Sequence, residues 1–124
     1  MAGKILFVDD EPAIVKVTAF RLRQAGYEVS VAGNGKEALE LLRDPLKRPG
    51  LILLDLSMPV MDGYQACKLI KGSPDLKDIP VVFFTASNSM VNIEEQVKEF
   101  GAADYIVKPF EPQELLEKIS RHIK

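Results

Sequence analysis

The sequence predicts an α/β fold, a doubly wound (βα)5 sandwich in which a five-stranded parallel sheet carries helices on both faces. Short apolar runs occur five times along the chain, and a longer segment with helical spacing of apolar residues follows each run. The runs "LILL" at 51–54 and "VVFF" at 81–84 lack polar alternation, which is typical of parallel strands covered on both faces. A length of 124 residues fits one domain, residues 1–124, with a single core.

The apolar runs are expected to form strands at Lys4–Val8, Tyr27–Ala32, Leu51–Leu54, Val81–Phe84 and Tyr105–Val107. The first helix is expected to begin at Pro12, because proline is favoured in a first turn, and to run to Gly26, a common helix stop. Its apolar residues Val15, Ala19 and Leu22 fall on one face, which predicts the side that packs on the sheet.

The second helix has a start signal at Asn34, an acceptor side chain followed three residues later by Glu37. Its apolar residues precede Pro45 and are Leu39, Leu41 and Leu42. The third helix is expected to start near Gly63 and to end at "GSP", residues 72–74, because glycine and proline both disfavour continuation of a helix.

The last two helices show the same one-sided pattern. In the fourth, the apolar residues Ile93, Val97 and Phe100 precede a stop at Gly101. In the fifth, Pro112 in the first turn is followed by Leu116, Ile119 and Ile123. Each helix therefore has an apolar stripe that can face the sheet.

Composition excludes several classes of function. A net charge of −2 without a long basic cluster gives no support for direct nucleic-acid binding. The single Cys67 cannot form an internal disulfide, which suits a reducing cytoplasm. No apolar run approaches the ~18–20 residues of a spanning helix, so no membrane insertion is expected. A cytoplasmic location is predicted.

Charged and hydroxyl residues follow four of the expected strands. Asp9 and Asp10 follow the first strand, Asp55 the third, Thr85 the fourth and Lys108 the fifth. In a doubly wound sheet, functional groups gather at the carboxyl ends of the strands, so we expect these side chains to meet at one edge. Glu11, beside the first two acids, is interpreted as a helix-start residue rather than a ligand.

Three neighbouring carboxylates repel one another unless a cation compensates their charge. Mg²⁺ takes oxygen ligands and commonly binds a few carboxylates together with phosphate oxygens, which fits a site without His or Cys. With Lys108, such a site can accept a phosphoryl group, and Asp55 can act as its nucleophile and become an acyl phosphate. The Thr85 hydroxyl can stabilise the phosphoryl oxygens.

The chain resembles the receiver domains of two-component response regulators, the CheY-like family. The resemblance covers nearly the whole chain and rests on "LFVDDEP" at 6–12, "LILLDLSMPVMDGYQ" at 51–65, "VVFFTA" at 81–86 and "GAADYIVKPF" at 101–110. It implies the strand order 2-1-3-4-5 and a receiver domain with no output domain in this chain. The sequence is equally compatible with a stand-alone receiver and with part of a longer regulator.

The resemblance also implies a role for each matching residue. Asp10 would bind Mg²⁺ directly and Asp9 mostly through water, and the backbone carbonyl of Ser57 would complete the metal ligands together with Asp55, the phosphoacceptor. Lys108 would pair with a phosphate oxygen.

The resemblance further implies a conformational switch. Thr85 would rotate toward the phosphate, Tyr105 would move between outward and inward rotamers, and the Lys108–Pro109 peptide bond would be cis. The loop around Ala86–Ser89 would then move together with the face formed by the fourth helix, the fifth strand and the fifth helix.

The implied function is a phospho-accepting signalling switch. A sensor histidine kinase or histidine phosphotransfer protein would donate the phosphoryl group, and a downstream protein target would bind the switched face. The domain would not be an enzyme in the usual sense, although it would catalyse its own phosphorylation and dephosphorylation. His122, the only histidine, lies in the last expected helical turn and is not expected to be a phosphodonor.

Three alternatives belong to other classes. An aspartyl-phosphate phosphatase resembling haloacid dehalogenases would need a second acid two residues after its nucleophile, where this chain has Ser57. A flavodoxin-like carrier would need a phosphate-binding loop after the first strand, where this chain has acids. An interaction module with the receiver fold but no phosphorylation stays open.

Overall fold

A computed structural model describes residues 3–56, 63–86, 93–108 and 110–124. Its five strands are β1 (Lys4–Val8), β2 (Glu28–Ala32), β3 (Leu51–Asp55), β4 (Val81–Ala86) and β5 (Asp104–Lys108). They form one parallel sheet in the order β2-β1-β3-β4-β5, which confirms the expected strand order.

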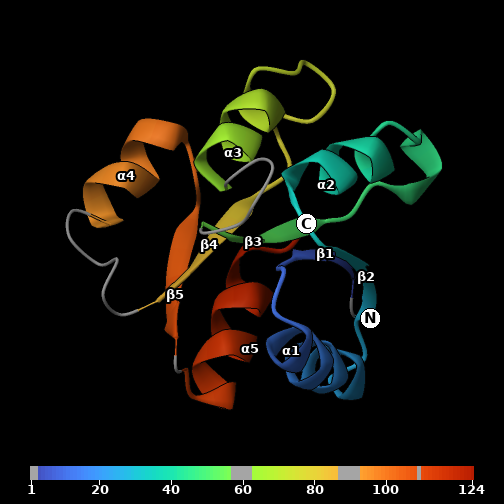
Figure 1. The fold of residues 1–124 in the computed structure, drawn as a ribbon, viewed down its shortest axis with the longest axis vertical. Helices are drawn as coiled ribbons and strands as arrows, with labels where there is room; N and C mark the ends of the chain where they lie inside the picture. Colours follow the sequence, from blue (N-terminus) through green and yellow to red (C-terminus); the bar gives the residue numbers. More distant parts are fainter. Residues whose placement is uncertain (1–2, 57–62, 87–92, 109) are drawn as a thin grey trace.

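Helices cover both faces of this sheet. They are α1 (Pro12–Gln24), α2 (Gly35–Leu42), α3 (Gly63–Lys71), α4 (Ile93–Phe100) and α5 (Pro112–His122), with a short 3-10 helix, η1, at Pro45–Lys47. Helices α1 and α5 lie on one face, and α2, α3 and α4 lie on the other (Figure 1). The doubly wound (βα)5 sandwich predicted from the sequence is therefore confirmed.

Strand ends differ from the sequence expectation where the functional residues occur. Asp55 and Lys108 are the last residues of β3 and β5 rather than the residues that follow them, and β4 continues through Thr85 to Ala86. The reason is continued pairing: Asp55 lies opposite Phe84, and Ala86 lies opposite Lys108. The sheet therefore fixes the backbone of these residues directly.

The sequence predicted a single core, but the sheet separates the buried residues into two cores, one on each face. One contains Leu6, Leu54 and Phe83 under α2, α3 and α4, and the other contains Phe7, Leu53 and Phe84 against α1 and α5. All five residues of β3 are buried, as the absence of polar alternation predicted.

Two helices bury slightly different stripes from those expected. In α5, Leu115 and Ile119 are the fully buried residues, while Leu116 and Ile123 are only partly buried. In α1, Thr18 is buried beside Ala19 and Leu22. A polar residue carries no apolar signal, so its inward position was not visible in the pattern.

Helix α2 begins as its sequence predicts. The Asn34 side chain accepts a hydrogen bond from the Glu37 backbone N–H at 2.9 Å. The Glu37 carboxylate in turn accepts from the Gly33 backbone N–H at 3.2 Å. Helix α1 begins without a side-chain cap, and Glu11 occupies the position before Pro12. Glu11 is thus a helix-start residue, as interpreted from the sequence.

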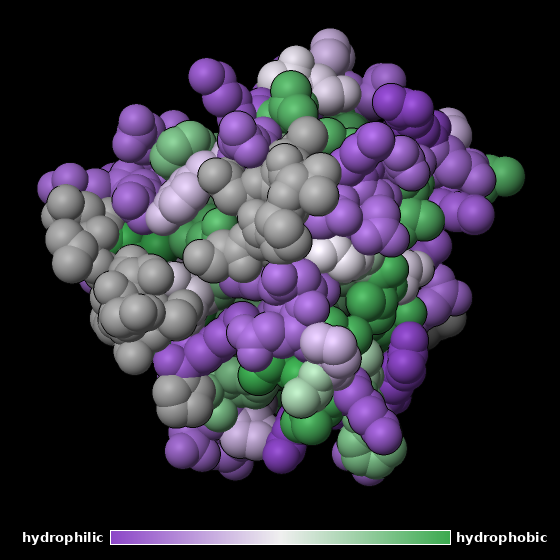
Figure 2. Space-filling model, in the orientation of Figure 1, coloured by the Kyte–Doolittle hydropathy of each residue, from purple (hydrophilic) through white to green (hydrophobic). Residues whose placement is uncertain are grey.

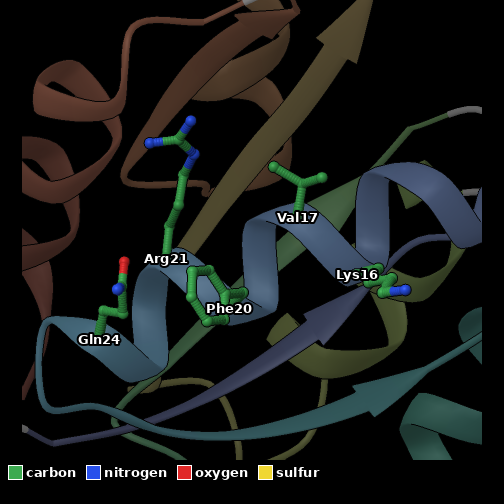
Figure 3. A pocket seen from close by; sticks show the side chains of 5 residues that line it. All are labelled: Lys16, Val17, Phe20, Arg21 and Gln24. Carbon is green, nitrogen blue, oxygen red and sulfur yellow. The ribbon is translucent and has the colours of Figure 1, made fainter.

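The surface is mostly hydrophilic on the face shown in Figure 2, with apolar areas over α1. Val17 and Phe20 in α1 are 52% and 60% exposed. They line a shallow groove of about 340 Å³ with Lys16, Arg21 and Gln24 (Figure 3). Across the described part of the chain, every helix is too short or too polar to span a bilayer.

Candidate active site

The structure brings three carboxylates together at the carboxyl end of the sheet. Asp9 and Asp10 follow β1, and Asp55 ends the neighbouring strand β3. One oxygen from each of the three side chains lies within 4.8 Å of the others. Asp9 and Asp55 are 1% and 3% exposed, whereas Asp10 is exposed. The cluster therefore consists of two buried acids, Asp9 and Asp55, and one solvent-exposed acid, Asp10.

Lys108 lies inside this acid cluster. Its Nζ is 3.1 Å from Asp9 Oδ2, 3.7 Å from Asp55 Oδ1 and 3.9 Å from Glu11 Oε1. The side chain is only 14% exposed, and the ammonium lies 4.7 Å from the centroid of the Phe84 ring. An ammonium held between two buried carboxylates offsets part of their repulsion.

Asp9 is further stabilised by the start of α1. Its Oδ1 accepts a hydrogen bond from the Glu11 backbone N–H at 3.0 Å, while its Oδ2 binds Lys108. The two oxygens of this carboxylate thus have separate partners. The sequence predicted Asp9 as one of three neighbouring acids that bind a metal, but it did not predict this hydrogen bond, because a residue pattern does not show backbone donors.

Thr85 lies next to the site in the strand register. It follows Phe84, the residue that pairs with Asp55, and it is 1% exposed. The structure thus places a hydroxyl side chain on the strand between β3 and β5, near the ends that carry Asp55 and Lys108.

Tyr105 lies on the edge strand β5 beside α4. Its hydroxyl donates to Glu94 Oε1 at 3.4 Å. Partial burial, followed by the negative charge of Glu94, raises the pKa of Tyr105 above its usual value. The hydroxyl is therefore a hydrogen-bond donor across the physiological pH range.

Gly63 has a closer relation to the site than its sequence motif suggested. Its backbone N–H donates to the Leu56 carbonyl at 3.2 Å. A Cβ at position 63 would lie 2.3 Å from the Asp55 carbonyl oxygen and 2.7 Å from Leu56 Cα. Only glycine allows the start of α3 to approach the backbone of Asp55 this closely.

Some predicted features lie outside the described residues. They are the Ser57 carbonyl, the residues at positions 87–89 of the switching loop, and Pro109 with its peptide bond to Lys108. These features stay predictions. His122 lies at the far end of α5, where its Nε2 is 3.0 Å from Asp104 Oδ2.

Comparison with known proteins identifies the family of this chain. The chain belongs to the response regulator receiver domain family, whose model matches residues 5–120. It thus belongs to the receiver domains of two-component signalling systems.

Individual relatives agree with this family. The chain is 35% identical over 124 residues to the DNA-binding response regulator MtrA of Mycolicibacterium smegmatis, covering 100% of this chain and 52% of MtrA. It spans about half the length of the curated relatives it matches. The DNA-binding function in that relative's name belongs to a protein about twice as long.

Solved structures agree as well. The chemotaxis response regulator CheY4 of Vibrio cholerae superposes with a TM-score of 0.88 at 32% identity, covering 99% of this chain and 100% of that chain. The receiver domain of the sensor histidine kinase PA1611 from Pseudomonas aeruginosa PAO1 gives a TM-score of 0.85 at 31% identity, with 98% of both chains covered. That structure has a magnesium ion coordinated in its active site cleft.

Proposed function

We propose that this domain is a Mg²⁺-dependent, phospho-accepting switch in which Asp55 receives the phosphoryl group. The observation that carries the proposal is the placement of Asp55. Its carboxylate ends the central strand, lies within 4.8 Å of ligand atoms from Asp9 and Asp10, and is 3.7 Å from the Lys108 ammonium. The proposed nucleophile, Asp55, thus lies close to an acid pair that can bind a cation, Asp9 and Asp10, and to the positive charge of Lys108.

The donor set fits Mg²⁺. Asp9, Asp10 and Asp55 offer oxygen atoms only, and Mg²⁺ prefers oxygen ligands together with water. The exposed Asp10 would bind the hydrated ion, and the buried Asp9 and Asp55 would be its other acidic partners. Bound Mg²⁺ supplies positive charge that neutralises the oxygens of an incoming phosphoryl group. The Ser57 carbonyl is proposed as a further ligand.

The Asp55 carboxylate performs the transfer. One of its oxygens attacks phosphorus, an O–P bond forms and the P–N bond to the donor imidazole breaks. The leaving nitrogen keeps the electron pair of that bond and takes a proton from solvent. Lys108 stabilises charge on a phosphoryl oxygen, and the Thr85 hydroxyl donates to another. Attack of water on phosphorus later breaks the O–P bond and resets the domain.

The new charge on Asp55 is the signal. Lys108 exchanges part of its interaction with Asp9 for the phosphoryl group, and Thr85 moves toward it. Tyr105 then turns inward from its position beside α4. The outcome is a changed surface on α4, β5 and α5, which alters affinity for a downstream protein.

The phosphodonor is proposed to be a histidine kinase or histidine phosphotransfer protein that docks on the outer face of α1. This helix starts directly after the acid cluster. Its exposed Val17 and Phe20 lie roughly one and a half and two turns after Pro12 and form an apolar contact surface (Figure 3). Docking there would bring a donor close to Asp55.

The free thiol of Cys67 suits a cytoplasmic place of action.

The metal requirement gives the first test. Native protein is incubated with acetyl phosphate, with Mg²⁺ or with EDTA, and the mass of the intact chain is measured. We expect one added phosphoryl group only with Mg²⁺, and a strong decrease in labelling in Asp10→Asn. Asp75→Asn, which changes another exposed acid, is the matched control. Labelling in EDTA, or equal labelling of the two variants, would contradict the proposed metal site.

A further inference from the structure

Lys118 in α5 contacts both the backbone and the ring of Tyr105. Its Nζ donates to the Tyr105 carbonyl oxygen at 2.6 Å and lies 4.7 Å from the centroid of the Tyr105 ring. Because β5 is an edge strand, a carbonyl on its open side needs a partner from outside the sheet. The lysine satisfies that carbonyl, and its charge attracts the face of the aromatic ring.

Asp104 holds Lys118 in this place. Asp104 Oδ1 is 3.4 Å from Lys118 Nζ and accepts the Tyr105 backbone N–H at 2.8 Å, while Oδ2 is 3.0 Å from His122 Nε2. Lys118 and His122 are one helical turn apart in α5, and this spacing lets both side chains contact the Asp104 carboxylate. Burial raises the pKa of Asp104, but the hydrogen bonds from Tyr105 and His122 and the charge of Lys118 outweigh it, and the pKa is lowered. The carboxylate is therefore charged at neutral pH.

Glu94 in α4 contacts the other end of Tyr105. Its Oε1 accepts from the Tyr105 hydroxyl at 3.4 Å. The Tyr105 side chain is thus positioned between an ammonium from α5, at its ring face, and a carboxylate from α4, at its hydroxyl. An inward turn of the ring would break the contact with Glu94 and move the ring away from Lys118.

We propose that Lys118 and Glu94 form a latch that keeps Tyr105 outward in the resting domain, and that Asp104 and His122 position Lys118 for this purpose. These four residues are positioning residues, because they act on the switch through Tyr105. The consequence for signalling rests on the proposed function: a weaker latch makes the inward state more accessible before phosphorylation. The latch itself concerns only the resting rotamer of Tyr105.

The test measures that rotamer without any phosphodonor. Three-bond NMR couplings about χ1 of Tyr105 give the ratio of its rotamers in native protein, in Glu94→Ala and in Lys118→Met. Loss of one contact of this kind should change the ratio by about two- to tenfold. Glu94→Gln and Lys118→Arg keep an acceptor and a cation, and should restore most of the native ratio.

Matched controls are available on α4. Glu95→Ala removes the adjacent exposed acid, and Lys98→Met removes an exposed lysine. The proposal is upheld if the latch variants shift the ratio and the controls do not. It is overturned if the ratio stays native in both latch variants, or if the controls shift it equally.

A second arm separates this inference from the proposed function. The latch variants are labelled with acetyl phosphate and Mg²⁺, and the initial rate is compared with that of native protein. Shifted rotamers with faster labelling support both the latch and the phospho-accepting function. Shifted rotamers in a protein that never labels support the latch and contradict the function. Unshifted rotamers in a protein that labels normally contradict the latch alone.

Discussion

Lys108 Nζ lies 3.1 Å from Asp9 Oδ2, although the two residues are 99 positions apart in the chain. The contact joins the last residue of β5 to the residue after β1, across the ends of β3 and β4. Asp9 has a fully buried side chain, so the ammonium provides charge compensation that water does not. This ion pair links the stability of the fold to the chemistry of the site.

Removal of the Lys108 ammonium should destabilise the protein in the absence of metal. Lys108→Met leaves the buried carboxylates of Asp9 and Asp55 without this cation, and we expect the free energy of unfolding in EDTA to fall by about 3 kcal/mol. Mg²⁺ should recover part of the loss, because it supplies positive charge to the same acids. Urea unfolding with EDTA and with Mg²⁺ measures both effects.

Lys98→Met is the control for that experiment, because Lys98 is exposed on α4. Its effect should stay within about 0.5 kcal/mol. Equal losses in the two variants, or a loss in Lys108→Met that Mg²⁺ does not change, would contradict a charge-compensating role for Lys108.

The close approach of α3 to Asp55 predicts a second effect. A methyl group at position 63 would overlap the Asp55 and Leu56 backbone, so Gly63→Ala should cost about 1–3 kcal/mol of stability and slow phosphoryl labelling. In Gly72→Ala, the new Cβ would lie 3.3 Å from the Lys68 carbonyl oxygen, a milder contact. Thermal unfolding and labelling rates of the two variants should therefore differ clearly, and similar values would refute the steric explanation.

Cys67 gives a pH prediction. Burial raises the pKa of its thiol from 9.0 to about 11, with a smaller opposing effect from the charge of Lys71. Between pH 9 and 11 the unfolded chain loses this proton while the folded chain keeps it, so the thiol lowers stability as pH rises through that window. The slope approaches about 1.4 kcal/mol per pH unit.

The comparison that isolates this effect is native protein against Cys67→Ala. Unfolding free energies measured from pH 8 to 10.5 should diverge above pH 9, with native protein losing more, because the other titrating groups are common to both chains. Parallel curves would show that the thiol ionises equally in both states. At pH 8 the folded thiol should also resist alkylation until the protein unfolds.

The exposed face of α1 predicts a difference between phosphodonors. Phe20→Ala removes apolar contact surface without touching the acid cluster. Transfer from a phosphorylated histidine phosphotransfer protein should therefore slow by about five- to thirtyfold, which corresponds to a contact worth about 1–2 kcal/mol. Transfer from acetyl phosphate should be unchanged. Leu69→Ala, which shortens a 52% exposed leucine on α3, is the control. Equal slowing with both donors would place the defect in the site rather than in docking.

Much of the fold was predictable because its signals are local. Unbroken apolar runs identified β3 and β4, and the Asn34 and Glu37 pair identified the start of α2. The position of Asp9, Asp10 and Asp55 at one edge followed from the rule that strand ends carry the functional groups.

Other features depend on contacts that a one-dimensional pattern does not carry. The Glu11 backbone N–H on Asp9 and the approach of Gly63 to Asp55 both arise from backbone positions set by the whole sheet. The contact of Lys118 with Tyr105 joins a helix to a strand thirteen residues away. The sequence indicated Tyr105 as a switch residue, but it gave no signal for Lys118 as its partner. Burial of Thr18 likewise depends on how α1 rests on the sheet.

Borohydride reduction tests most directly whether Asp55 is the phosphoacceptor. Protein labelled with acetyl phosphate and Mg²⁺ is treated with borohydride, which reduces an aspartyl phosphate to homoserine, and the peptides are sequenced by mass spectrometry. We predict homoserine at position 55 in native protein and no homoserine in Asp55→Asn. Homoserine at another aspartate, or the same labelling in Asp55→Asn, would contradict the assignment.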